Sequence, residues 1–74
     1  MDLTITVREE RPGYWARVVE LPGCFASGRS IGELHQALEE AIGLYLWDCP
    51  EAVILADGEL GEGERRVQVM QVFP

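Results

Sequence analysis

The sequence predicts an α+β fold of the order β-β-β-α-β, an antiparallel meander with one amphipathic helix on one face of the sheet and a final strand. Residues 3–27 alternate apolar and polar side chains between proline- and glycine-containing turns, the period-two pattern of half-buried strands. Residues 31–46 repeat apolar side chains at helical spacing. Residues 65–73 return to a strand-like pattern. With one helix available, only one face of the sheet is expected to be covered.

The first three strands are expected over residues 3–8, 14–20 and 24–27. Residues 10–13 contain a proline followed by a glycine, a pair that favours a turn, so the first two strands should form a hairpin. Residues 21–23 read LPG and should interrupt the second strand, because proline lacks a backbone N–H for the ladder. A three-stranded meander follows.

The helix is expected to begin at Ile31. Ser30 and Glu33 have the S-x-x-E spacing of a capping box, in which the serine accepts from the Glu33 N–H and the glutamate reaches back to the cap. Pro50 cannot continue a helix, so the end is expected between Leu46 and Asp48. The apolar stripe comprises Ile31, Leu34, Leu38, Ala41, Ile42 and Tyr45.

After the helix comes a short apolar run, residues 52–55, and then a glycine- and acid-rich segment, residues 56–64, expected to be a mobile loop. Residues 65–73 should form the last strand. Its apolar side chains alternate between two faces, with Val67 and Val69 on one and Met70 and Val72 on the other. We expect a partner protein to bind the face of the sheet that the helix does not cover, or an edge of the sheet.

The chain has 74 residues, and we expect residues 1–74 to form one domain. A core this small rarely contributes more than about 3–5 kcal/mol without disulfides, metal or association, so a homodimer is expected. The net charge is −7, with six arginines and no lysine. This charge argues against direct nucleic-acid binding, which needs a basic footprint. It suits a basic partner protein, although acidity is also a general means of keeping proteins soluble.

No residue pattern indicates catalysis, a metal or a cofactor, so we expect the chain not to be an enzyme. Cys24 and Cys49 have no CxxC or zinc-ligand spacing and are expected to be buried free thiols. His35, the only histidine, has no neighbouring nucleophile pattern. Carboxylates expected near strand and helix ends lack ligand spacing: Asp2, Glu20, Asp48 and Asp57.

The N-terminal segment MDLTITVREE lacks the basic flank and apolar run of a signal peptide, and no stretch is apolar enough to span a membrane. A cytoplasmic location is expected. The aromatic residues are interpreted as core or interface residues: Trp15, Phe25, Tyr45 and Trp47. A base-stacking platform would need a basic groove beside the rings, and the only arginines next to each other in the sequence are Arg65 and Arg66. The candidate interface residues are Trp47, Met70 and Val72.

Three segments together resemble the HicB-like antitoxin family. Residues 13–16 read GYWA, residues 20–28 read ELPGCFASG, and residues 30–33 read SIGE and open a helix that ends EAIGLYL. The resemblance spans roughly residues 13–46. The family-motif positions are Gly13, Tyr14, Leu21, Pro22, Gly23, Cys24, Gly28, Ser30 and Glu33. They are interpreted as structural, since glycine, proline and a capping serine shape the backbone.

The resemblance implies a partial ribonuclease-H-like fold without nuclease activity that binds and neutralises a small basic mRNA-cleaving toxin. The family commonly carries a C-terminal DNA-binding module, and this sequence ends at Pro74 without one, so we expect no operator binding. Two alternatives stay open: a stand-alone homo-oligomeric relative with another partner, and a residual metal-dependent nuclease.

Overall fold

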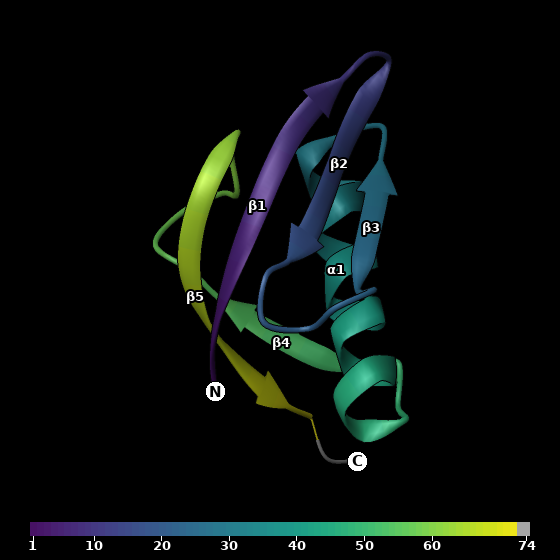
Figure 1. Cartoon of the computed structure of the whole chain (residues 1–74), viewed down its shortest axis with the longest axis vertical. Helices are drawn as coiled ribbons and strands as arrows, with labels where there is room; N and C mark the ends of the chain where they lie inside the picture. Colours follow the sequence, from purple (N-terminus) through teal and green to yellow (C-terminus); the bar gives the residue numbers. More distant parts are fainter. Residues whose placement is uncertain (73–74) are drawn as a thin grey trace.

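The computed structural model of the chain describes residues 1–72 and consists of one helix packed on a curled antiparallel sheet (Figure 1). The elements are β1 (Asp2–Glu10), β2 (Gly13–Val18), β3 (Phe25–Gly28), α1 (Ile31–Trp47), β4 (Ala52–Leu55) and β5 (Gly63–Gln71). The strand order is β3-β2-β1-β5-β4, and each neighbouring pair is antiparallel. The α+β class, the three-stranded meander and the single helix are therefore confirmed.

One strand was not expected. Residues 52–55 form β4, which pairs with β5 from Ala52 opposite Gln71 to Leu55 opposite Gln68. Four consecutive apolar residues show no alternation, so periodicity could not identify them as a strand. The last strand begins at Gly63, two residues earlier than expected, and ends at Gln71. Phe73, the expected end, lies outside the described residues.

The β2–β3 connection is longer than expected. β2 ends at Val18 rather than at residue 20, because the chain turns there: the Leu21 N–H donates to Val18 O at 3.2 Å, and the Cys24 N–H donates to Leu21 O at 3.0 Å. β3 then begins at Phe25. The LPG interruption is confirmed, and it removes two residues from the second strand.

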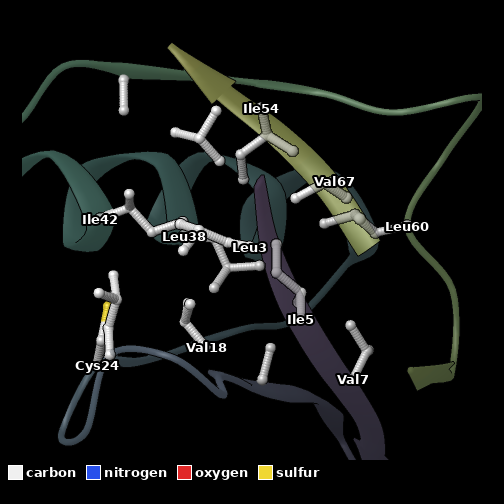
Figure 2. Close-up of a cluster of buried hydrophobic side chains, with 14 of the residues drawn as sticks. Leu3, Ile5, Val7, Val18, Cys24, Leu38, Ile42, Ile54, Leu60 and Val67 are labelled. Carbon is white, nitrogen blue, oxygen red and sulfur yellow. The ribbon is translucent and has the colours of Figure 1, made fainter. Parts of the chain in front are cut away.

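The core lies between α1 and the face of the sheet that it covers (Figure 2). Leu3, Ile5 and Val7 alternate along β1 and are at most 2% exposed, as the period-two pattern predicts. Leu34, Leu38 and Ile42 of α1 are fully buried against them. The other buried apolar residues are Ala16, Val18, Leu21, Cys24, Ala52, Ile54, Leu60, Val67 and Val69.

The apolar stripe of α1 is only partly buried. Ile31 and Ala41 lie half-buried at its margins, and Tyr45 is 48% exposed. The Tyr45 hydroxyl donates to Pro22 O at 3.0 Å, so the ring lies over the β2–β3 turn rather than in the core. The expectation that Tyr45 packs inward is therefore wrong. The helix ends as expected, with Asp48 left-handed at φ 53° and its N–H bonded to Gly43 O.

The acidic segment between β4 and β5 is anchored to the fold. Leu60 is 2% exposed and belongs to the core. The Glu59 carbonyl accepts from Arg65 Nη1 at 3.0 Å, and Glu62 Oε2 accepts from the Glu9 N–H at 3.1 Å. The glycines and acids predict a mobile loop. In the structure, the segment is instead attached to the rest of the fold through the buried Leu60 and through the hydrogen bonds of Glu59 and Glu62. Leu60, the one large apolar residue of this segment, was the sequence feature that indicated contact with the core.

Within residues 1–72 no helix is long and apolar enough to cross a membrane.

Candidate protein-interaction surface

The family-motif residues at the β2–β3 turn build a tight loop. Leu21 and Cys24 are buried, and Gly23 takes φ 84°, a backbone conformation that favours glycine. The Val18 N–H donates to Cys24 O at 3.0 Å and closes the loop. Together with the Tyr45 bond to Pro22, these contacts hold the start of β3 against the end of α1.

Gly28 allows the start of α1 to approach the sheet. A Cβ on Gly28 would lie 2.6 Å from the Leu34 N, and a Cβ on Gly13 would contact Gly28 O. Ser30 Oγ accepts from the Glu33 N–H at 3.1 Å, which is the half of the expected capping box that the structure shows. The motif glycines and the capping serine thus shape the backbone, as interpreted from the sequence.

Exposed apolar side chains gather beside β3. Phe25 is 56% exposed and Leu44 50% exposed, and together with two alanines of α1 they line a shallow depression between the strand and the helix. We call this depression the β3–α1 groove; its residues are Phe25, Ala26, Ser27, Ala37, Glu40, Ala41 and Leu44. Tyr45 stands at the end near Gly23. The groove joins two elements and is lined mainly by apolar residues, and exposed apolar surfaces of this kind mark contacts with other proteins.

No pattern in the sequence predicted this groove. Phe25 and Leu44 are nineteen positions apart, and neither belongs to the apolar stripe or to the strand pattern that predicted the core. A usable signal was Leu44, a large apolar residue next to the stripe, with Ala37 and Ala41 at helical spacing before it.

The other face of the sheet has no helix and carries mixed side chains. Trp15 and Phe25 stack there with ring centroids 6.1 Å apart and planes inclined by 28°. Arg8 pairs across the ladder with Trp15, and Arg17 with Phe25. Cross-strand pairing therefore places Arg8 and Arg17 beside aromatic residues, a proximity that the sequence pattern did not predict. Half of the arginines of the chain lie on this face: Arg8, Arg17 and Arg66.

Glu20 is held at the middle of that face. Its Oε1 accepts from the Thr4 N–H at 2.7 Å, and its Oε2 accepts from Thr4 Oγ1 at 2.7 Å. Arg66 Nη1 lies 3.6 Å from the same Oε2. The backbone bond from Thr4, the Thr4 hydroxyl and, to a smaller extent, Arg66 lower the pKa of Glu20 below its ordinary value.

This lowered pKa predicts a pH-dependent contribution to stability. Because the folded-state pKa is depressed, the contribution is present above the ordinary value of 4.5 and is lost as pH falls through the folded-state pKa. We expect Glu20→Gln to be less stable than the parent at neutral pH, and the two unfolding free energies to converge in acid. Urea titrations across this range measure the difference. Arg66→Gln should have a smaller effect, and a gap that widens toward acid would contradict the assignment.

The three candidate interface residues do not form one surface. Met70 is 53% exposed on the helix-free face, opposite Val53 of β4. Trp47 is half-buried and packs against the core at the end of α1. Val72 follows the end of β5 and lines a shallow hollow with Gln36 and Glu39 of the helix. The alternation that placed Met70 and Val72 together does not continue past Gln71, because the strand ends there.

The titratable side chains are dispersed. Among residues 1–72 no three His, Cys, Asp or Glu side chains gather closely enough to hold a metal ion. His35 Nε2 lies 3.2 Å from Glu39 Oε2, its only recorded polar contact in this part of the chain. Cys24 is a free buried thiol whose pKa burial raises, and Cys49 is free but only half-buried. The features of the described residues that could bind another molecule are therefore the β3–α1 groove and the helix-free face of the sheet.

A search of curated proteins finds a UPF0150 protein of Archaeoglobus fulgidus that is 38% identical to this chain over 47 residues. The aligned region covers 62% of this chain and 68% of the relative. No protein-family model matches the sequence. No solved structure matches it either.

Proposed function

Because the chain belongs to the UPF0150 family, a HicB-like family, we propose that it is an antitoxin-type module that binds a small basic mRNA-cleaving toxin and neutralises it. Family membership is the observation that carries this proposal. The module acts by covering the toxin's working surface. It does so as a folded contact surface and catalyses no reaction.

The distribution of charge supports a basic partner. The chain carries −7 overall, while three of its six arginines lie on the helix-free face. The helix carries Glu33, Glu39 and Glu40 and no arginine, and Glu40 is the one charged residue of the β3–α1 groove. Opposite charges on two proteins raise their rate of association and disfavour partners of the same charge. A basic ribonuclease meets both the charge and the apolar groove.

The chemistry of the side chains supports action by contact. His35 is paired with Glu39, and Glu20 is bonded to Thr4, so each of these groups is engaged inside the fold. Their partners are the Thr4 hydroxyl and the Glu39 carboxylate, and within residues 1–72 no three His, Cys, Asp or Glu side chains gather around either pair. We expect no turnover and no direct binding of nucleic acid.

The product of the adjacent small gene provides the test. We expect its expression alone to arrest growth, co-expression of this chain to restore growth, and the two proteins to copurify. In vitro, mRNA cleavage by the partner should fall in proportion to added chain and stop at a fixed stoichiometric ratio. A neighbour that is neither toxic nor bound would overturn the antitoxin proposal and leave a family member with a different protein partner.

A homodimer stays a prediction for the free protein. The exposed Met70 and Leu55, on neighbouring strands of the helix-free face, are the observation that favours it. A strictly monomeric mass by light scattering at micromolar concentration would contradict it.

A further inference from the structure

The sheet has two edges, β3 and β4, and both are short strands without a charged residue. β3 reads FASG and β4 reads AVIL. Proteins usually guard an edge with charge, proline, a bulge or a covering element, since unpaired backbone groups invite another strand. Both edges share the protection that a short strand gives, so the difference between them must lie in what contacts them.

At the β4 edge, one outward backbone group already has a partner. Glu39 Oε2 accepts from the Ile54 N–H at 2.9 Å, and the same oxygen lies 3.2 Å from His35 Nε2. Ile54 pairs with Val69, whose N–H and C=O bond to Met1 on the β1 side. In an antiparallel ladder, successive residues direct their N–H and C=O groups to opposite sides of the strand. Because Val69 bonds to the β1 side, its partner Ile54 directs its backbone groups away from β5, toward the open side of β4. Glu39 therefore caps the point at which an added strand would bond.

The β3 edge is open. The Val18 N–H bond to Cys24 O sets the ladder so that alternate residues of β3 face β2, and Phe25 and Ser27 direct their N–H and C=O groups outward. Within residues 1–72 no loop or side chain bonds to these four groups. Buried backbone groups are nearly always paired, so a strand that arrives here satisfies them as it covers them.

The β3–α1 groove lies directly beside this open edge. Ala37 and Ala41 present only methyl groups, which leaves room for side chains of an added strand next to the helix. Phe25 and Leu44 supply exposed apolar area on either side. Glu40 is the one charged residue in the groove. Main-chain bonds give affinity in strand addition, and pockets for alternate side chains give specificity.

From these contacts, and resting on the proposed function, we infer that the β3 edge receives an extended segment of the basic partner as an added strand. Alternate apolar side chains of that segment lie in the β3–α1 groove, and a basic side chain faces Glu40. A second copy of the chain fits less well, because two-fold pairing of β3 with itself brings two acidic helices together, and α1 has no arginine to oppose Glu40.

The test uses the full chain labelled with ¹⁵N and two synthetic peptides of alternating residues, one of arginine and valine and one of glutamate and valine. We expect the arginine peptide to bind and to slow hydrogen exchange at the Phe25 and Ser27 amides, with no change in exchange at Ile54. The glutamate peptide should not bind.

Two charge reversals separate local from overall charge. Glu40→Arg should weaken binding of the arginine peptide by about tenfold or more. Asp57→Arg changes the net charge equally, but Asp57 is an exposed residue in the connection that follows β4, at the opposite edge of the sheet from β3, so it should change binding only slightly. Thermal unfolding of both variants checks that they fold. Equal weakening by the two variants would show that net charge alone is responsible and would overturn the inference.

The remaining outcomes distinguish this inference from the proposed function. Slowed exchange at β4 amides, or none at Phe25 and Ser27, overturns the β3 location even if the toxin is bound and neutralised. Protection of Phe25 and Ser27 in a free protein of dimeric mass shows that a second copy occupies the edge. Binding of the arginine peptide at β3 without neutralisation of the neighbouring gene product supports the edge and overturns the antitoxin proposal.

Discussion

Replacing Leu38 by alanine is expected to lower the free energy of unfolding by about 2–5 kcal/mol, the range for removing a large apolar side chain from a packed core. Leu38 is fully buried at the centre of α1 and packs over the sheet. A domain of this size holds only about 3–5 kcal/mol in total when it stands alone. The variant should therefore be largely unfolded at room temperature, as measured by urea titration with circular dichroism.

Leu44→Ala provides the matched control on the same helix. Leu44 is 50% exposed, so truncating it removes little buried area, and we expect a change of less than about 1 kcal/mol. Both substitutions have the same effect on helix propensity, so the difference between them isolates burial. Similar losses in the two variants would contradict the packing described for α1.

Glycine-to-alanine substitutions at two positions of α1 are expected to have opposite signs. A Cβ at Gly43 would meet Cys49 O and lie 2.9 Å from the Glu51 N, both backbone atoms of the segment that returns beneath the helix. Forced overpacking costs about 1–3 kcal/mol, which exceeds the helix-propensity gain of about 1 kcal/mol. Gly43→Ala should therefore destabilise the protein and loosen the start of β4.

Gly32 provides the comparison. The nearest atom to a Cβ there is Ser30 Oγ at 3.8 Å, which is ordinary contact, so Gly32→Ala should stabilise the protein by about 0.5–1 kcal/mol. The melting temperature of each variant, compared with that of the parent protein, tests both predictions. A stabilising Gly43→Ala would show that the segment after the helix does not lie against Gly43.

Local signals were sufficient for most of the fold. The capping serine three positions before Glu33 placed the start of α1, and the alternation of Leu3, Ile5 and Val7 placed the buried face of β1. These features act over a few residues, so the sequence contains them directly. β4 was missed because its four apolar residues have no period, and its strand character comes from pairing with β5.

The interaction surface depended on pairings that no local pattern contains. The Thr4–Glu20 contact joins positions sixteen apart, and the contact of Thr4 with Arg66 joins positions sixty-two apart. Nothing in the helical pattern distinguishes Glu39 from the other polar residues of α1, yet its carboxylate reaches the backbone of β4. Which edge of a sheet is open is decided by such contacts between elements, so it became visible only once the strand order was known.

The contact of Glu39 with Ile54 has a consequence for behaviour at high concentration. A sheet with two available edges can lengthen without limit by joining molecules side by side, which is a route to fibrous aggregates. Here a carboxylate already bonds the Ile54 N–H at one edge, so a strand that adds to β4 must first displace it. Glu39→Ala removes this obstacle and should make the protein assemble more readily at high concentration.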